Sequence, residues 1–177
     1  MSTPEHVNAI LAGPQKNSER MPMDPTVLRL HIRSTLQLMG GKLWSPDAEE
    51  LLLGTCAQES HLGTYRRQLG GGPGTGIYQI EPATERSLWR DYLGYRPTMA
   101  TAVMRVCGVH DPDPLQLEMN LAYQHIMCRL RYWAWVKAPI PPTLSAQAQY
   151  WKEHYNTEMG AGKPEEYVSN YRRFVSA

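Results

Sequence analysis

The repeated pairing of a capping residue with proline constrains the fold of this chain more than any other feature. The pairs are Asp24-Pro25, Ser45-Pro46 and Asp113-Pro114. A capping side-chain oxygen accepts from the first free backbone N–H groups of a helix, and proline suits the first helical position because it has no N–H to pair. Each pair therefore predicts the start of a helix.

Glycine and proline also predict where the helices end. Gly40-Gly41 should close the first helix, Gly63 the second, and the prolines after Val136 the third. Shorter helices are predicted over 83–93, 98–107, 144–155 and 164–175. The only short β-like run is 76–80. This pattern predicts an all-α (α-rich) single domain with at most a very short β element.

The segment opened by Asp113-Pro114 is predicted to run as one helix to about Val136. Its apolar side chains occupy both sides, with Leu117 and Cys128 on one side and Ile126 and Leu130 on the other. A helix that is apolar on both sides is buried on both sides. We therefore expect this segment to be the central helix of the domain.

The length of 177 residues corresponds to one domain, since domains typically have roughly 100–200 residues. The first 23 residues contain three prolines and little periodicity. We predict a weakly ordered N-terminal arm over 1–23 and the folded domain over 24–177.

Charge and composition argue against several classes of function. The net charge of +1 gives no basic excess for binding nucleic acid or a membrane surface. No apolar run approaches the roughly 18–20 residues of a membrane span, so no membrane insertion is expected. The N-terminus lacks the charged-then-apolar order of a signal peptide. The three cysteines form no CxxC pair, and we expect neither a metal site nor a cofactor.

Glu59 stands out in the helix that begins at Ser45-Pro46. The apolar positions of this helix form one stripe, and Glu59 lies about 20° from Ala48 on the helical wheel. Burial and the dipole at the helix C-terminus both disfavour a carboxylate there and raise its pKa. A carboxyl that stays protonated near neutral pH can act as a general acid. The helix alone also allows a structural pair, in which a buried arginine or backbone donors hold Glu59.

The residues after Glu59 resemble a known family. Glu59-Ser60 is followed by a glycine-rich loop and then by GIYQIEPAT at 76–84. This order resembles the lytic transglycosylase and goose-type lysozyme superfamily, whose members carry Glu-Ser at a helix end and a Gly-Leu-Met-Gln-Ile-Met-Pro-Ala-Thr-like segment after it. Residues 119–133 resemble the long central helix of the family, and 147–162 and 166–168 resemble its later motifs. Glu81 within this segment, with Trp89 following, makes the chain most similar to phage-encoded members.

The resemblance implies a lysozyme-like fold and an enzyme that cleaves peptidoglycan with Glu59 as the single catalytic residue. Glu59 would protonate the oxygen between N-acetylmuramic acid and N-acetylglucosamine and then accept a proton from the C6 hydroxyl, which gives a 1,6-anhydro product. If water attacks instead, Glu81 or Asp91 would serve as the second carboxylate; their plainer roles are a capping acid and a solvated helix charge. The substrate-binding residues that the resemblance implies are Tyr78, Gln79, Ile80, Tyr155 and Asn156.

Two departures from the family pattern leave a second function open. Residues 68–76 replace the usual Ser-x-x-Gly-Ala-x-Gly loop, and the Ala-Tyr-Asn-Ala-Gly motif is interrupted between Asn156 and Gly160. The alternative is a non-catalytic virion structural or assembly protein that keeps the fold. A third class, a helical regulatory or DNA-binding module, is disfavoured by the near-zero net charge.

The expected location follows from the resemblance. The protein would be made in the cytoplasm of a bacterial host and would act on the periplasmic cell wall, as a lysis protein or a virion component. Its expected partners are peptidoglycan glycan strands and, for a virion component, other virion proteins.

Overall fold

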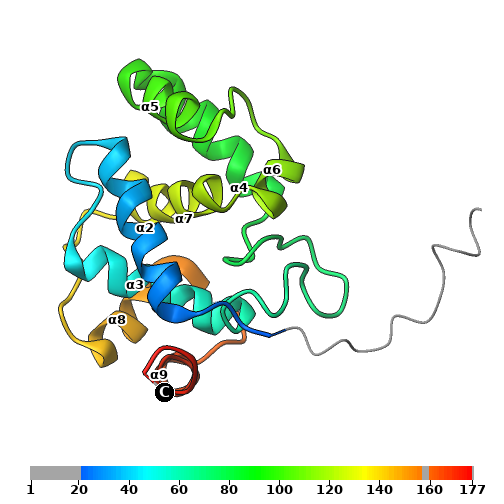
Figure 1. Cartoon of the computed structure of the whole chain (residues 1–177), viewed down its shortest axis with the longest axis vertical. Helices are drawn as coiled ribbons and strands as arrows, with labels where there is room; N and C mark the ends of the chain where they lie inside the picture. The colour runs from blue at the N-terminus through cyan, green and yellow to red at the C-terminus, as the bar shows by residue number, and fades with distance from the viewer. Residues whose placement is uncertain (1–20, 157–159, 177) are drawn as a thin grey trace, which may run out of the picture.

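The computed structural model describes residues 21–156 and 160–176, and within them the chain is helical, as predicted (Figure 1). The α-helices are α2 (Pro25–Met39), α3 (Pro46–Ser60), α4 (Pro82–Ser87), α5 (Pro97–Cys107), α6 (Pro114–Met119), α7 (Leu121–Trp135), α8 (Leu144–Trp151) and α9 (Pro164–Phe174). Two π-helical turns, η1 (Leu88–Tyr92) and η3 (Lys152–Asn156), extend α4 and α8, and the short 3-10 turn η2 (Leu93–Tyr95) follows η1.

The three predicted helix starts are confirmed. The side chains of Asp24, Ser45 and Asp113 each accept hydrogen bonds from backbone N–H groups two or three positions further on. Helix α3 ends at Ser60, earlier than the expected stop at Gly63, because His61 already adopts a left-handed conformation with φ of 51°.

The prediction of one helix over 113–136 is wrong. Asn120 has an extended conformation with ψ of 100° and separates α6 from α7. Its side chain accepts from the backbone N–H of Tyr123 (3.2 Å), so Asn120 is the N-cap of a new helix. Asparagine is among the best N-cap residues, because its side-chain oxygen can satisfy an N–H group that the helix leaves free.

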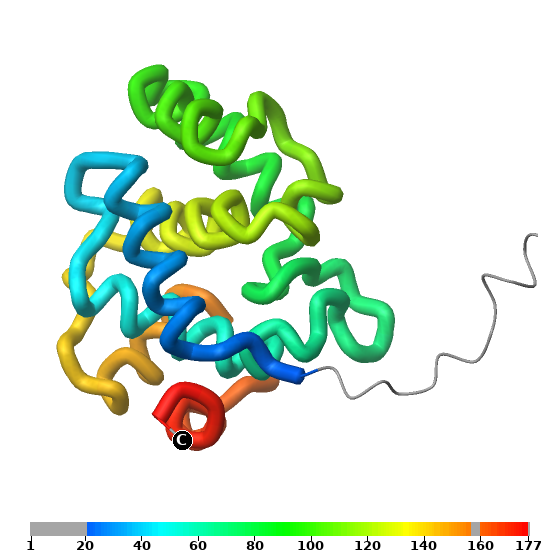
Figure 2. The backbone as a smooth tube through the Cα atoms, in the orientation of Figure 1, coloured from blue at the N-terminus to red at the C-terminus, as the bar shows by residue number. Residues whose placement is uncertain are grey.

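Helix α7 is nevertheless the central helix. It packs against α2, α3, α5 and η3, and most of its side chains are buried. Figures 1 and 2 show α7 between α5 on one side and α3 on the other.

The β-like run at 76–80 forms no strand in the described part of the chain. Thr75 makes isolated bridges to Arg67 and Ile80, and these close the glycine-rich loop on itself. The expectation of at most a very short β element is confirmed.

Helix α3 is buried almost all round, because α9 packs directly on it (Figure 2). A Cβ atom on Gly54 would lie 2.0 Å from the Tyr167 hydroxyl oxygen, so only glycine permits this approach. The Tyr167 hydroxyl donates to the Leu51 carbonyl oxygen (3.2 Å). The close packing fixes the last turn of α3, which carries Glu59.

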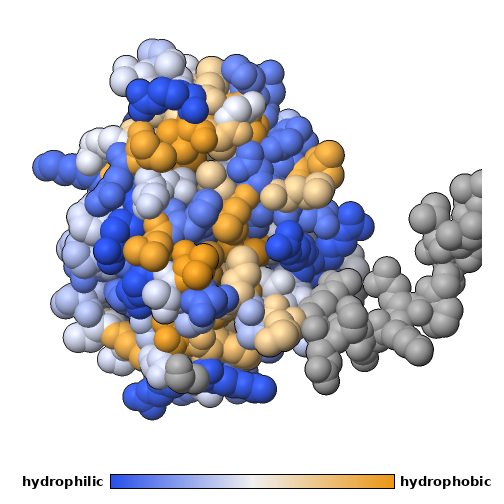
Figure 3. Space-filling view, in the orientation of Figure 1, coloured by the Kyte–Doolittle hydropathy of each residue, from blue (hydrophilic) through white to orange (hydrophobic). Residues whose placement is uncertain are grey.

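Helix α2 leaves part of its apolar surface exposed. Val27, Leu30 and Leu38 are among the exposed apolar residues. Figure 3 shows that hydrophobic and hydrophilic side chains alternate over the face that includes α2. None of the helices in residues 21–156 and 160–176 is both long and apolar enough to cross a membrane.

Most of the predicted N-terminal arm, residues 1–20, lies outside the described residues. The remaining part touches the domain, since the backbone N–H of Met23 donates to the Leu62 carbonyl oxygen (2.8 Å).

Candidate active site

Glu59, in the last turn of α3, lines a cavity of about 540 Å³. Residues from α3, the loop between α3 and α4, α7, η3 and the segment that precedes α9 surround this cavity, so segments far apart in the sequence meet there. Its other lining residues are Gln58, His61, Tyr65, Gln68, Leu69, Gln79, Glu81, Arg131, Tyr155, Asn156, Gly160 and Ala161.

The environment of Glu59 favours its neutral form. Burial raises the pKa of Glu59 to about 7, although a hydrogen bond from Trp151 and the positive charge of Arg131 act in the opposite direction. No arginine, lysine or histidine forms an ion pair with Glu59 within the described residues. The structural pair that the helix pattern also allowed is therefore not formed with any described side chain.

Trp151, at the end of α8, holds the Glu59 carboxyl in place. Its indole N–H donates to Oε1 of Glu59 (2.9 Å), and its ring packs against Tyr167 of α9. Because Oε1 accepts this bond, the proton of the neutral carboxyl belongs on Oε2. No local sequence pattern predicts this contact, since 92 positions separate the two residues.

The segment 76–80 is fixed against α6 and α7. The backbone N–H of Ile77 donates to Oε1 of Gln124 (2.7 Å). Gly76 has φ of 73°, and a Cβ atom there would lie 2.4 Å from the Leu117 carbonyl oxygen. Glycine is therefore required at this position, both for the backbone conformation and for the close approach.

Gln79 lines the cavity from this segment and has a left-handed conformation with φ of 50°. Its amide nitrogen donates to the Gly76 carbonyl oxygen (2.7 Å), while its amide oxygen has no partner among the described residues. A strained backbone conformation in a non-glycine residue is typical of functional sites. Gln79 thus lines the cavity beside Glu59 with an amide group whose nitrogen is bonded to the backbone of Gly76 and Tyr65.

Tyr78 and Ile80 are not among the residues that line the cavity, so the structure does not bring their side chains beside Glu59 as the resemblance implied. Both are buried in the core. The Tyr78 hydroxyl bonds Nδ1 of His125 (2.7 Å). The left-handed turn at Gln79 directs its side chain to the cavity, while the residues on either side of it pack inward.

Tyr155 and Asn156 line the same cavity as Glu59, as expected. The Tyr155 hydroxyl donates to the Tyr78 carbonyl oxygen (2.7 Å), so Tyr155 supplies a wall and not a free hydroxyl. Oδ1 of Asn156 accepts from Nζ of Lys152 (2.8 Å).

The two candidate second carboxylates lie in different places. Glu81 lines the cavity of Glu59; it occupies the N-cap position of α4, but its side chain makes no capping hydrogen bond. Asp91 does not line this cavity. It pairs with Arg90 (2.6 Å between Nε and Oδ1), and hydrogen bonds from that guanidinium lower the pKa of Asp91. The structure therefore does not place Asp91 beside Glu59.

Ser60 bonds the backbone, as its position on the helical wheel predicts. Its hydroxyl donates to the Ile77 carbonyl oxygen (2.6 Å) and accepts from the Gly63 N–H (2.9 Å). This bond joins the end of α3 to the segment that carries Gln79, and so sets Glu59 and Gln79 on one cavity.

Within residues 21–156 and 160–176, no three histidine, cysteine, aspartate or glutamate side chains gather to hold a metal ion. The cavity is lined by carboxyl, amide, imidazole, phenol and guanidinium side chains. Comparisons of the chain with protein-family models, curated proteins and solved structures find no match.

Proposed function

We propose that this protein is a peptidoglycan-cleaving lytic transglycosylase in which Glu59 is the only catalytic acid and base. One observation carries the proposal: a carboxyl with a pKa of about 7 lines an open cavity and is paired with no described cation. An acid with a pKa near the working pH can both give and take a proton in one reaction cycle.

In the first step, Oε2 of neutral Glu59 gives its proton to the glycosidic oxygen as the bond from that oxygen to C1 of the muramyl sugar breaks. The N-acetyl group of the same sugar can stabilise the positive charge that develops at C1. Trp151 keeps its hydrogen bond to Oε1 throughout. The Gln79 amide oxygen can accept from a substrate N–H or hydroxyl group.

In the second step, the Glu59 carboxylate takes the proton of the C6 hydroxyl while that oxygen bonds to C1. This step closes the 1,6-anhydro ring and restores neutral Glu59. A single carboxyl suffices for this cycle, in contrast to the two carboxylates of most glycosidases. Hydrolysis would need a base for water, and Glu81 is the carboxylate that lines the cavity for that role.

The test is the release of muropeptides from purified bacterial cell walls by wild type, Glu59→Gln and Glu81→Gln. The transglycosylase proposal expects release of anhydro products by wild type and by Glu81→Gln, and none by Glu59→Gln. Mass spectrometry separates anhydro from hydrolysed products. If wild type instead releases hydrolysed products and Glu81→Gln is inactive, the results would favour a lysozyme reaction, in which water attacks. Release by Glu59→Gln would contradict the role of Glu59, and no release by any folded protein would favour a non-catalytic virion role.

A further inference from the structure

Arg131 of α7 lies where two cavities meet. It lines the cavity of Glu59 and also a second cavity of about 700 Å³. The second cavity is also lined by Asp91, Glu153 and the imidazole of His154, beside the half-exposed ring of Trp135. A ligand that occupies both cavities must therefore pass the Arg131 side chain.

The guanidinium of Arg131 is held in place without being neutralised. One of its nitrogens, Nη2, donates to the Tyr155 carbonyl oxygen, and the guanidinium carbon lies 4.0 Å from the centre of the Tyr155 ring. No carboxylate forms an ion pair with Arg131 in the described parts of the chain.

This arrangement leaves most of the donors of Arg131 available. A guanidinium has five N–H donors in one plane, and its fork matches the two oxygens of a carboxylate. Arg131 is partly buried. Its stack on Tyr155 also fixes the fork before a ligand arrives, which reduces the entropy lost on binding.

We propose that Arg131 binds a carboxylate of the glycan substrate. The proposal rests on the proposed function and makes it more specific. Peptidoglycan has two sources of carboxylate: the lactyl group of an unsubstituted muramyl sugar, and the peptide stem where that lactyl group is substituted. Chitin-type glycans have neither. Arg131 would therefore select peptidoglycan over an uncharged glycan, and the second cavity would hold the branch that leaves the muramyl sugar.

Binding can be measured by calorimetry with Glu59→Gln, so that no ligand is consumed. Four ligands are compared: chitotetraose, the alternating N-acetylglucosamine–N-acetylmuramic acid tetrasaccharide, the same tetrasaccharide with its lactyl carboxylates converted to methyl amides, and the tetrasaccharide with peptide stems. A lactyl site predicts about ten-fold tighter binding of the free acid than of the methyl amide. If Arg131 binds a carboxylate of the peptide stem instead, only the tetrasaccharide with peptide stems should bind about ten-fold more tightly.

Arg131→Gln in the same background should remove the gain, and Arg131→Lys should restore part of it, because lysine keeps the charge but not the fork. Arg105→Gln is the matched control, since Arg105 also donates to a backbone carbonyl (Leu38, 3.1 Å) but lines a different cavity. It should leave every affinity unchanged.

Equal affinity for all four ligands would overturn the Arg131 proposal and leave the proposed function standing. A gain that persists in folded Arg131→Gln would overturn it as well. If the folded protein binds none of the glycans, the proposed function itself fails, and the role of Arg131 fails with it. If an Arg131 variant does not fold, the four affinities measured with Glu59→Gln still show whether the site prefers a glycan that has a carboxylate.

Discussion

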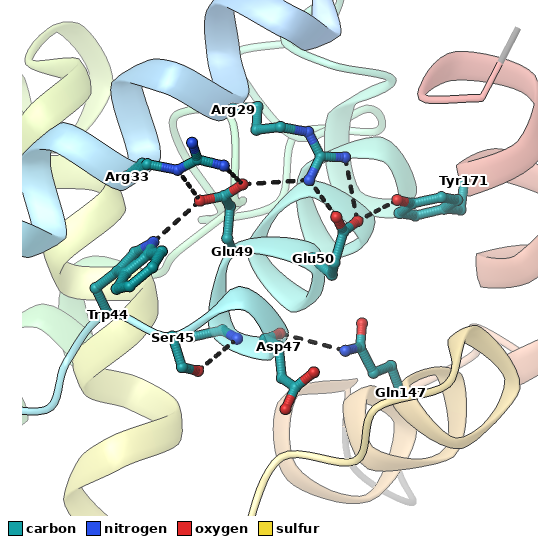
Figure 4. Close-up of polar contacts among 10 residues, drawn as sticks. Arg29, Arg33, Trp44, Ser45, Asp47, Glu49, Glu50, Gln147 and Tyr171 are labelled. Atoms are coloured by element: carbon teal, nitrogen blue, oxygen red, sulfur yellow. Dashed lines mark hydrogen bonds and ion pairs between the residues drawn. The ribbon is translucent and has the colours of Figure 1, made fainter.

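Glu49 and Glu59 belong to the same helix, but Glu49 forms ion pairs with Arg29 and Arg33 (Figure 4), whereas Glu59 forms none within the described residues. Its carboxylate accepts from Nε of Arg33 (2.8 Å), from Arg29 (3.2 Å) and from the Trp44 indole (3.0 Å). Burial alone would raise the pKa of Glu49, but these hydrogen bonds outweigh it and lower the pKa. Helix α2 supplies the arginines to the first turn of α3, whereas the last turn ends at a cavity. One helix therefore contains both a structural and a candidate catalytic carboxyl.

The stability of Glu59→Gln relative to wild type should depend on pH. The pKa of Glu59 is about 7 in the folded protein against an ordinary value of 4.5. Between pH 4.5 and about pH 7, the folded state therefore binds more protons than the unfolded state. The free energy of unfolding of the wild type consequently falls as pH rises through this window. Glutamine does not titrate, so the stability of the variant relative to wild type should increase by about 3 kcal/mol from about pH 4 to about pH 8. Urea unfolding at several pH values measures the difference, and a constant difference would contradict the raised pKa.

Glu49→Gln is the matched substitution with the opposite expectation. It removes a buried carboxylate (2% exposed) from two arginines that are themselves partly exposed. We expect a loss of stability at neutral pH, because both guanidinium groups and the Trp44 indole lose an anionic partner; the exposure of the two arginines limits the size of this loss. Glu59→Gln should lower activity without this loss, and Glu49→Gln should lower stability without changing the chemistry at Glu59. Equal loss of stability in both variants would assign a structural role to both carboxyls.

Trp151→Phe should shift the pH profile of activity. The indole hydrogen bond lowers the pKa of Glu59, so its removal should raise that pKa above about 7 and move the high-pH limb of the rate to higher pH. Trp89→Phe is the control, because that indole donates to the Tyr123 hydroxyl (2.7 Å) and not to Glu59. Both variants should lose stability, but only Trp151→Phe should shift the profile. Identical profiles for both variants and wild type would show that Trp151 only packs.

In the folded protein, His125 should remain neutral even at pH values well below its ordinary pKa. It is fully buried, its Nε2 has no partner among the described residues, and its ring lies 5.1 Å from that of His31. Burial, and then the charge of His31, lower the pKa of His125 well below 6.5. The unfolded chain takes up the proton that the folded state excludes, so stability should fall as pH drops below about 6.5. NMR titration of the imidazole nitrogens tests this, and a folded-state transition near 6.5 would refute it.

Gly54→Ala should destabilise the contact between α3 and α9. The new Cβ would lie 2.0 Å from the Tyr167 hydroxyl oxygen, so Tyr167 would have to move and its hydrogen bond to Leu51 would be lost. We expect a loss of about 3 kcal/mol or more from overpacking. Gly94→Ala is the control, since its Cβ would meet nothing closer than 3.3 Å. Thermal unfolding compares the two, and equal melting temperatures would contradict the packing described for α3.

The sequence determined the helical class and the helix starts, because capping acts within three or four residues. Asp24, Ser45 and Asp113 show this directly. The apolar pattern continues through Asn120 and therefore does not indicate the break there, although asparagine is itself a capping signal. The sequence also singled out Glu59, because a carboxyl on an apolar helix face near its end is a local anomaly.

The tertiary structure decided what surrounds that carboxyl. The helix pattern allowed either an ion pair or a free acid for Glu59, and the choice depends on which helix packs beside which turn. Trp151 and Arg131 reach Glu59 from helices far along the chain, and no local pattern encodes that approach. The turn at Gln79 likewise sends Tyr78 into the core and Gln79 to the cavity, because contacts with α6 and α7 fix the backbone there. Capping is a short-range interaction, whereas burial and electrostatic environment are sums over residues that only folding brings together.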